Sequence, residues 1–76
     1  MMYTLHIRSR HGVYRKLYDF DRFSDAFDQL IAAVVKLSNA RYWISTANEA
    51  IPHHSRLFEY DPDHDTLEDL ISIRDD

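Results

Sequence analysis

Residues 23–37 read FSDAFDQLIAAVVKL, and apolar side chains recur in them at intervals of three and four positions. This spacing is that of an α-helix with one apolar stripe, because such a helix has about 3.6 residues per turn. The stripe consists of Phe23, Phe27, Leu30, Val34 and Leu37. Asp21 or Ser24 can cap the first turn, and Ser38 with Asn39 ends the helix. We expect this helix to supply much of the hydrophobic core.

Alternating polar and apolar residues predict strands on both sides of this helix. The predicted strands are residues 3–8, 13–20, 41–46 and 56–60. Gly12, the only glycine, lies between the first two strands, and its freedom to adopt positive φ favours a hairpin there. In the second strand we expect Tyr14, Tyr18 and Phe20 to share one face. The pattern predicts an α+β fold, in which a β-β-α-β-β antiparallel sheet carries one amphipathic helix on one face.

The C-terminal end allows two structures. Residues 61–65, DPDHD, predict a turn because proline suits the second position of a β-turn and aspartates bond nearby amides. Residues 66–69 resemble a capping box that opens a short helix, whereas residues 70–73 could return as a strand along residues 56–60. Of the two, we favour the short C-terminal strand.

The chain has 76 residues, the size of one small domain spanning residues 1–76. Hydrophobic residues make up 45% and charged residues 29%, which is the balance of a globular protein. Its apolar runs are far shorter than the roughly 20 residues needed to cross a bilayer. The alternating N-terminus does not read as a signal peptide, and the lack of cysteine excludes disulfides and thiolate zinc sites. We therefore expect a cytoplasmic protein without a membrane span.

The net charge of −4 hides a strong asymmetry along the chain. Residues 1–20 contain four Arg and Lys side chains against one aspartate, whereas residues 57–76 contain eight carboxylates against one arginine. One interpretation is a solvated acidic surface that keeps the protein soluble. The other is an acidic patch that binds a basic protein surface, such as one that normally holds nucleic acid. This patch would consist of Glu59, Asp61, Asp63, Asp65, Glu68 and Asp69.

One helix covers only part of a four-stranded sheet, so the other face must be polar or be covered by a partner or a second copy. If Tyr42 faces the core, strand alternation turns Trp43 outward, although loops could partly cover it. Tyrosine, tryptophan and arginine dominate interface hot spots. We therefore expect Trp43 and Tyr42 to anchor a protein partner. We also expect the protein to form a homodimer or to belong to an assembly such as a host nucleoprotein complex.

The N-terminal basic residues support an alternative function, a small nucleic-acid-binding protein or a nuclease resembling toxin ribonucleases in composition only. Its phosphate clamp would consist of Arg8, Arg10, Arg15 and Lys16. His6 and His11 would transfer protons. The overall negative charge opposes this function, because duplex phosphates require a net basic footprint. The chain also lacks a glycine-rich phosphate loop, a nucleophile elbow and a Ser-x-x-Lys motif. We expect neither enzymatic activity nor direct nucleic-acid binding.

Two groups of residues suggest metal sites. One group is acidic: Asp61, Asp63, Asp65 and Glu68. A helix-loop-helix calcium site needs glycine at its sixth position and glutamate at its twelfth, where this chain has Thr66 and Ser72. The other group is histidine-rich: His53, His54 and His64. The first two lie in a predicted loop, residues 47–55, and no helical His-x-x-x-His spacing supports zinc. We expect no metal and no cofactor.

Residues 17–27, LYDFDRFSDAF, lead from a predicted strand into the predicted helix. This stretch resembles the strand-to-helix entry of small phage-encoded host-takeover and anti-CRISPR proteins. The resemblance implies a non-catalytic inhibitor that sits on a host complex, sometimes through acidic residues placed where DNA or RNA would lie. It covers a minor part of the chain, and no individual functional residue transfers from it. Together with the acidic patch, it favours a protein-binding inhibitor in the host cytoplasm that occludes a basic, nucleic-acid-binding surface.

Overall fold

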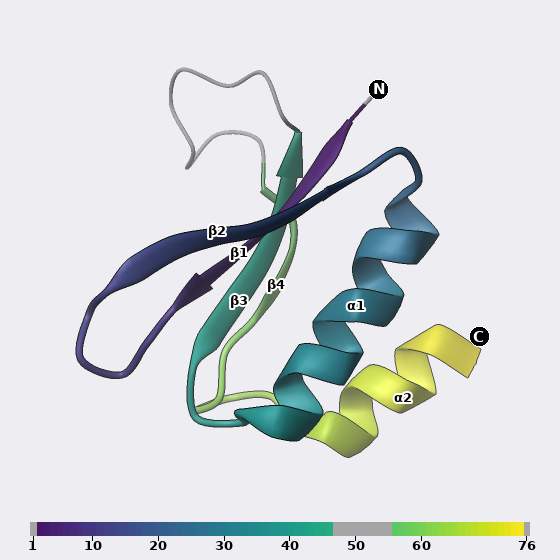
Figure 1. Cartoon of the computed structure of the whole chain (residues 1–76). Helices are drawn as coiled ribbons and strands as arrows, with labels where there is room; N and C mark the ends of the chain where they lie inside the picture. The colour runs from purple at the N-terminus through teal and green to yellow at the C-terminus, as the bar shows by residue number, and fades with distance from the viewer. Residues whose placement is uncertain (1, 47–55, 76) are drawn as a thin grey trace.

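Two helices lie on one face of a four-stranded antiparallel sheet in the computed structural model, which describes residues 2–46 and 56–75 (Figure 1). The elements in chain order are β1 (Tyr3–Arg8), β2 (Tyr14–Phe20), α1 (Phe23–Lys36), β3 (Arg41–Thr46), β4 (Arg56–Tyr60) and α2 (Leu67–Asp75). In the sheet the strands follow the order β2-β1-β3-β4. The predicted α+β class and the four predicted strands are confirmed, while the predicted loop at residues 47–55, with His53 and His54, lies outside the described residues.

The β1–β2 hairpin turns at Gly12, whose φ of 84° lies in the left-handed region that glycine adopts without penalty. Pairing in this hairpin shifts between Leu5, which faces Tyr18, and His6, which faces Lys16, so that Leu17 is an extra residue. The bulge puts Tyr14 on the opposite face of the sheet from Tyr18. The prediction that Tyr14, Tyr18 and Phe20 share one face is therefore wrong for Tyr14, because the strict alternation breaks at Leu17.

Helix α1 buries the middle of its apolar stripe against the sheet, with Phe27, Leu30 and Val34 all inaccessible or nearly so. Neither predicted cap is used, because the N-cap residue is Arg22 and its side chain makes no capping hydrogen bond. The other end is closed by a strand residue. The Tyr42 hydroxyl donates to the Leu37 carbonyl oxygen at 2.7 Å and lies 3.2 Å from the Ala33 carbonyl oxygen. Tyr42 thus satisfies the Leu37 carbonyl oxygen at the helix end, whereas the Ala33 carbonyl oxygen also accepts from the Leu37 amide at 2.9 Å.

Residues 67–75 form helix α2, so the favoured strand at residues 70–73 is wrong. Thr66 begins the helix: its carbonyl oxygen accepts from the Leu70 amide at 3.2 Å, and its Oγ1 accepts from the Asp69 amide at 3.3 Å. Leu70 is buried and Leu67 half-buried against the core, which a helical spacing of three residues allows. Helix α2 packs beside α1, on the same side of the sheet (Figure 1).

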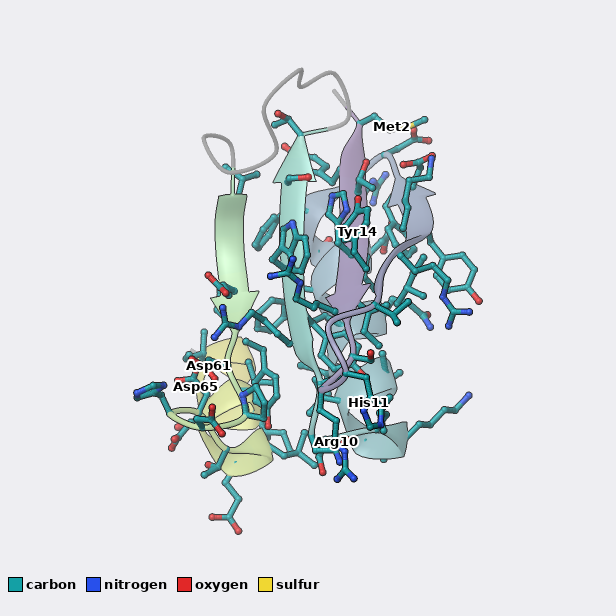
Figure 2. All side chains as sticks on the ribbon, turned by 90° about the vertical axis from the view of Figure 1, so that its left-hand side faces the viewer. Met2, Arg10, His11, Tyr14, Asp61 and Asp65 are labelled. Carbon is teal, nitrogen blue, oxygen red and sulfur yellow. The ribbon has the colours of Figure 1, made fainter. Side chains whose placement is uncertain are left out.

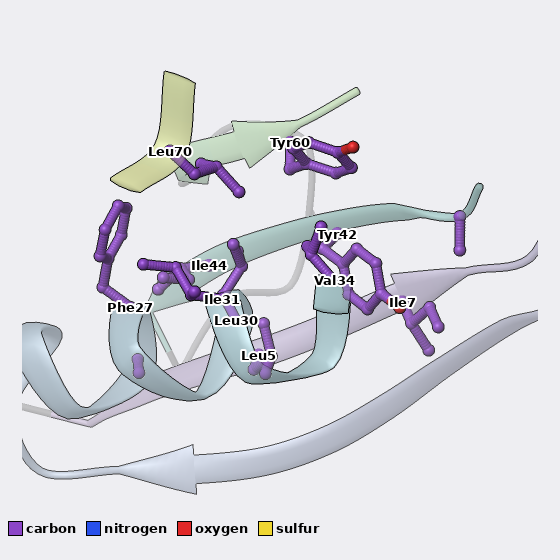
Figure 3. Close-up of a cluster of buried hydrophobic side chains, with 12 residues drawn as sticks. Leu5, Ile7, Phe27, Leu30, Ile31, Val34, Tyr42, Ile44, Tyr60 and Leu70 are labelled. Carbon is purple, nitrogen blue, oxygen red and sulfur yellow. The ribbon is translucent and has the colours of Figure 1, made fainter. Parts of the chain in front are cut away.

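The hydrophobic core lies between the sheet and the two helices, as Figure 3 shows. Its buried members are Leu5, Ile7, Ala26, Phe27, Leu30, Ile31, Val34, Ala40, Tyr42, Ile44, Tyr60 and Leu70. We call the other side of the sheet the open face, because no described helix lies on it (Figure 2). Within residues 2–46 and 56–75, neither helix has the length and apolar character that a membrane crossing requires.

Candidate functional site

Asp61, at the end of β4, is the centre of a hydrogen-bonded turn (Figure 2). Its Oδ1 accepts from the Asp63 amide at 3.0 Å, and its Oδ2 lies 2.8 Å from His64 Nδ1 and 3.3 Å from an Arg41 guanidinium nitrogen. Its own amide donates to Asp65 Oδ2 at 3.1 Å. The Asp63 amide and then His64 lower the pKa of Asp61, and the same carboxylate raises the pKa of His64. The Asp61 carboxylate is therefore already bound to groups of the protein itself.

The predicted acidic patch divides into two groups. Glu59 lies 3.4 Å from Arg41 Nε, so Glu59, Asp61 and Asp65 all serve internal contacts. The other three carboxylates are exposed and form no ion pair with any residue that the structure describes. We call them the acidic corner: Asp63, Glu68 and Asp69. They lie at the junction of the turn and α2, where Glu68 and Asp69 also occupy the first turn, the end of a helix that favours negative charge.

Three arginines line a crevice of about 370 Å³ at the same end of the sheet: Arg8, Arg10 and Arg41. Asp61 and Asp63 line it too, so the basic N-terminal segment and the acidic C-terminal segment meet there. The labelled Arg10 and His11 lie at the same end of the sheet as Asp61 and Asp65 in Figure 2. The charge asymmetry along the sequence is thus partly cancelled in space.

The remaining two predicted basic residues lie elsewhere. Arg15 lines a hollow between β2 and α1, on the helix side of the sheet. Lys16 forms an ion pair with Asp19 at 2.9 Å, and this contact is the main cause of the lowered pKa of Asp19. The four residues of the predicted phosphate clamp therefore do not form one continuous basic surface.

The predicted aromatic anchors are both inaccessible. Tyr42 lies in the core, and Trp43, though on the open face as alternation predicts, is only 3% exposed. Trp43 stacks on His6 with ring centroids 5.0 Å apart, and Tyr14 stacks over both rings. The prediction that Trp43 and Tyr42 anchor a partner is therefore wrong. The bulge at Leu17 explains why Trp43 is buried, because the bulge turns Tyr14 onto the open face, where Tyr14 covers Trp43.

His6 is the polar centre of this stack, which we call the histidine stack: His6, Tyr14, Trp43 and Ser45. Its Nδ1 lies 2.6 Å from the Tyr14 hydroxyl oxygen and its Nε2 lies 2.6 Å from Ser45 Oγ. A serine beside a histidine suggests a nucleophile with its base. Ser45 is fully buried, however, so its Oγ is not accessible to a substrate. His6 itself is buried, because the stack covers it.

No group of three or more His, Asp or Glu residues in the described segments could hold a metal ion. His64 Nδ1 faces Asp61, and His53 and His54 lie outside the described residues. His11 is exposed in the hairpin turn.

An apolar groove of about 440 Å³, absent from the sequence-based prediction, lies between the start of α1, β4 and the end of α2. We call it the phenylalanine groove, and its lining residues are Phe23, Ser24, Phe27, Asp28, Phe58 and Ile73. Phe27 packs edge-on against Phe58 with centroids 5.0 Å apart. Phe23 and Ile73 remain exposed at its sides. The signal in the sequence is the pair Phe23 and Phe27, four residues apart at a helix start, but its other walls come from distant segments.

No protein-family model, no curated protein and no solved structure matches this chain.

Proposed function

We propose that this protein is a non-catalytic protein-binding module whose acidic corner binds a basic surface of its partner. The observation that carries this proposal is that Asp63, Glu68 and Asp69 are exposed together, without an ion pair to any described residue. Exposed like charges repel one another, and a basic partner relieves that repulsion while steering its own approach.

The acidic corner is held in place before binding. Asp61 bonds to Asp63, His64 and Arg41, and Thr66 bonds to the Asp69 amide at the start of α2. A preformed surface loses less conformational entropy on association than a loose one does. The same corner is thereby suited to imitate a row of phosphates on a protein that normally holds nucleic acid, so the expected action is inhibition by occlusion.

The experiment compares two matched variants as bait in a lysate of the native host. Glu68→Gln neutralises one member of the acidic corner in the first turn of α2. Asp21→Asn removes the same charge from an exposed residue that precedes α1 and does not belong to the acidic corner. We expect the first variant to lose the proteins that the natural chain retains, the second to keep them, and added duplex DNA or RNA to release them.

Equal retention by both variants would contradict the proposal. A mobility shift of labelled RNA or DNA by the purified protein at low salt, abolished by Arg8→Ala with Arg10→Ala, would favour the nucleic-acid alternative instead. The homodimer expected from the sequence stays a prediction, which light scattering of the purified chain tests.

A further inference from the structure

We infer that the phenylalanine groove receives the apolar side chain of a basic amphipathic helix, the same partner that the acidic corner binds. This inference rests on the proposed function and specifies the chemistry of the partner. The groove is lined mainly by three aromatic rings and an isoleucine, and Phe23 and Ile73 at its sides stay exposed. Apolar walls open to water gain most from an apolar occupant.

Charge decides which apolar occupant fits. The helices that frame the groove, α1 and α2, contain five carboxylates against two cations. Asp28 lies in the groove wall itself, and Asp25 is exposed one turn earlier on α1. An acidic segment would be repelled by this field and a neutral one would gain nothing from it, whereas a basic segment is attracted to it. The occupant is therefore apolar on one side and basic around it.

Helix α2 connects the groove to the acidic corner. Asp69 and Ile73 are four residues apart on α2, which corresponds to about 6 Å along a helix axis. A partner helix places residues three or four positions apart on one face with the same separation. Lysine or arginine one turn from leucine or phenylalanine would thus reach the acidic corner and the groove at once, in the helix-in-groove manner.

The test uses three synthetic peptides of 18 residues as probes. The first has leucines at helical spacing of three and four with lysines elsewhere; the second replaces each leucine by alanine; the third replaces each lysine of the first by glutamate. Titration calorimetry with the full chain should give the tightest binding for the leucine–lysine peptide, weaker binding for the alanine–lysine peptide and none for the leucine–glutamate peptide.

Two variants of α2 locate the binding. Ile73→Ser removes a groove residue, and Ile71→Ser removes an isoleucine of similar exposure that does not line the groove. We expect Ile73→Ser to weaken the leucine–lysine peptide about tenfold, as loss of a half-buried isoleucine would. Ile71→Ser should leave its affinity unchanged, and neither variant should affect the alanine–lysine peptide.

The outcomes separate the two proposals. If neither lysine peptide binds, the acidic corner does not recognise basic helices and the proposed function fails. If both lysine peptides bind equally well, or if Ile71→Ser weakens binding as much as Ile73→Ser, the acidic corner stands and the groove is not the docking site. Circular dichroism of both variants excludes loss of α2 as the cause.

Discussion

Arg8 of β1 lies directly opposite Arg41 of β3 in the antiparallel pairing, so the two arginines are cross-strand neighbours on the same face of the sheet. Like charges at facing positions destabilise a strand pair. Arg41 is compensated by Glu59 at 3.4 Å and Asp61 at 3.3 Å, whereas no described residue forms an ion pair with Arg8. The carboxylates of β4 and its turn therefore make this arginine pair tolerable.

Replacing each arginine in turn should change stability in opposite directions. Arg8→Gln removes the repulsion from Arg41 without breaking an ion pair to any described residue, and it should raise the free energy of unfolding by about 0.2–1 kcal/mol. Arg41→Gln relieves the same repulsion but breaks two partly exposed ion pairs, each worth about 0.2–1 kcal/mol, so it should lower the free energy of unfolding. Urea unfolding at low salt measures both values. A loss of stability in Arg8→Gln as large as that in Arg41→Gln would contradict this account.

Tyr42 should stabilise the end of α1 through its hydroxyl as well as its ring. Burial raises its pKa, so the hydroxyl stays protonated and donates to the Leu37 carbonyl oxygen. Tyr42→Phe should cost about 1 kcal/mol, the usual net value of such a bond. Tyr18→Phe is the matched control, because Tyr18 is exposed on β2 and should tolerate the change. Thermal unfolding followed by circular dichroism compares the two, and equal melting temperatures would refute the assignment.

The histidine stack should stabilise the open face of the sheet. Ser45→Ala removes the buried hydroxyl 2.6 Å from His6 Nε2 and should cost about 1–3 kcal/mol. Tyr14→Phe removes the hydroxyl on the other side of the same ring. The effects of the two substitutions should not add, because both act on one imidazole. A double-mutant cycle in urea measures this interaction, and strict additivity would show that His6 does not link the two hydroxyls.

The turn around Asp61 should stabilise the fold most at mildly acidic pH. Its lowered pKa means that Asp61 stabilises the fold above about pH 4 and loses this effect as pH falls through the pKa it has in the folded state. The raised pKa of His64 means that its contribution is complete below about pH 6.5 and is lost as pH rises through its folded pKa.

His64→Ala should therefore lower the urea midpoint more at pH 5.5 than at pH 8.5. His11→Ala, a change at an exposed histidine in the hairpin turn, should show no such dependence. If the loss caused by His64→Ala is the same at both pH values, the imidazole does not act through its charge.

Leu70 should test the helical C-terminus. In α2 it is buried against the core, so Leu70→Ala should cost about 2–5 kcal/mol. Ile71→Ala, at an exposed neighbouring position, should change the free energy of unfolding little. A strand at residues 70–73 would also put these two side chains on opposite faces, so a second measurement is needed to distinguish it from the helix. Far-ultraviolet circular dichroism of a chain ending at residue 66 supplies it, because removing α2 should reduce the α-helical signal, whereas removing a strand should not.

Much of the fold could be predicted because its signals are local. The spacing of Phe27, Leu30 and Val34 identifies α1, and Gly12 between two alternating segments identifies the hairpin. The C-terminal prediction failed because residues 66–73 fit both the two-residue period of a strand and the roughly 3.6-residue period of a helix. What favours the helix is the packing of Leu70 into the core beside α1. The periodicity of a short segment contains no information about such packing against a distant helix.

The candidate site was harder to predict than the fold. Exposure of Asp63, Glu68 and Asp69 agrees with the predicted acidic patch, but the pairing of Glu59 and Asp61 with Arg41 depends on the β3–β4 register. The burial of Trp43 depends on one extra residue in β2, which moves Tyr14 to the open face. A shift of one position changes the face of every following side chain, so an error there changes the predicted surface.

The sequence alone determined every secondary-structure element except the last, because these elements follow from the spacing of apolar residues along the chain. It also excluded disulfides and thiolate metal sites, because the chain contains no cysteine. Only the tertiary structure decided which charges meet and which aromatic side chains are covered. Arg8 with Arg41, His6 with Ser45, and Phe27 with Phe58 are all brought together by strand register and helix packing over long sequence separations. Such contacts depend on how distant segments fit together, and no short stretch of sequence contains that information.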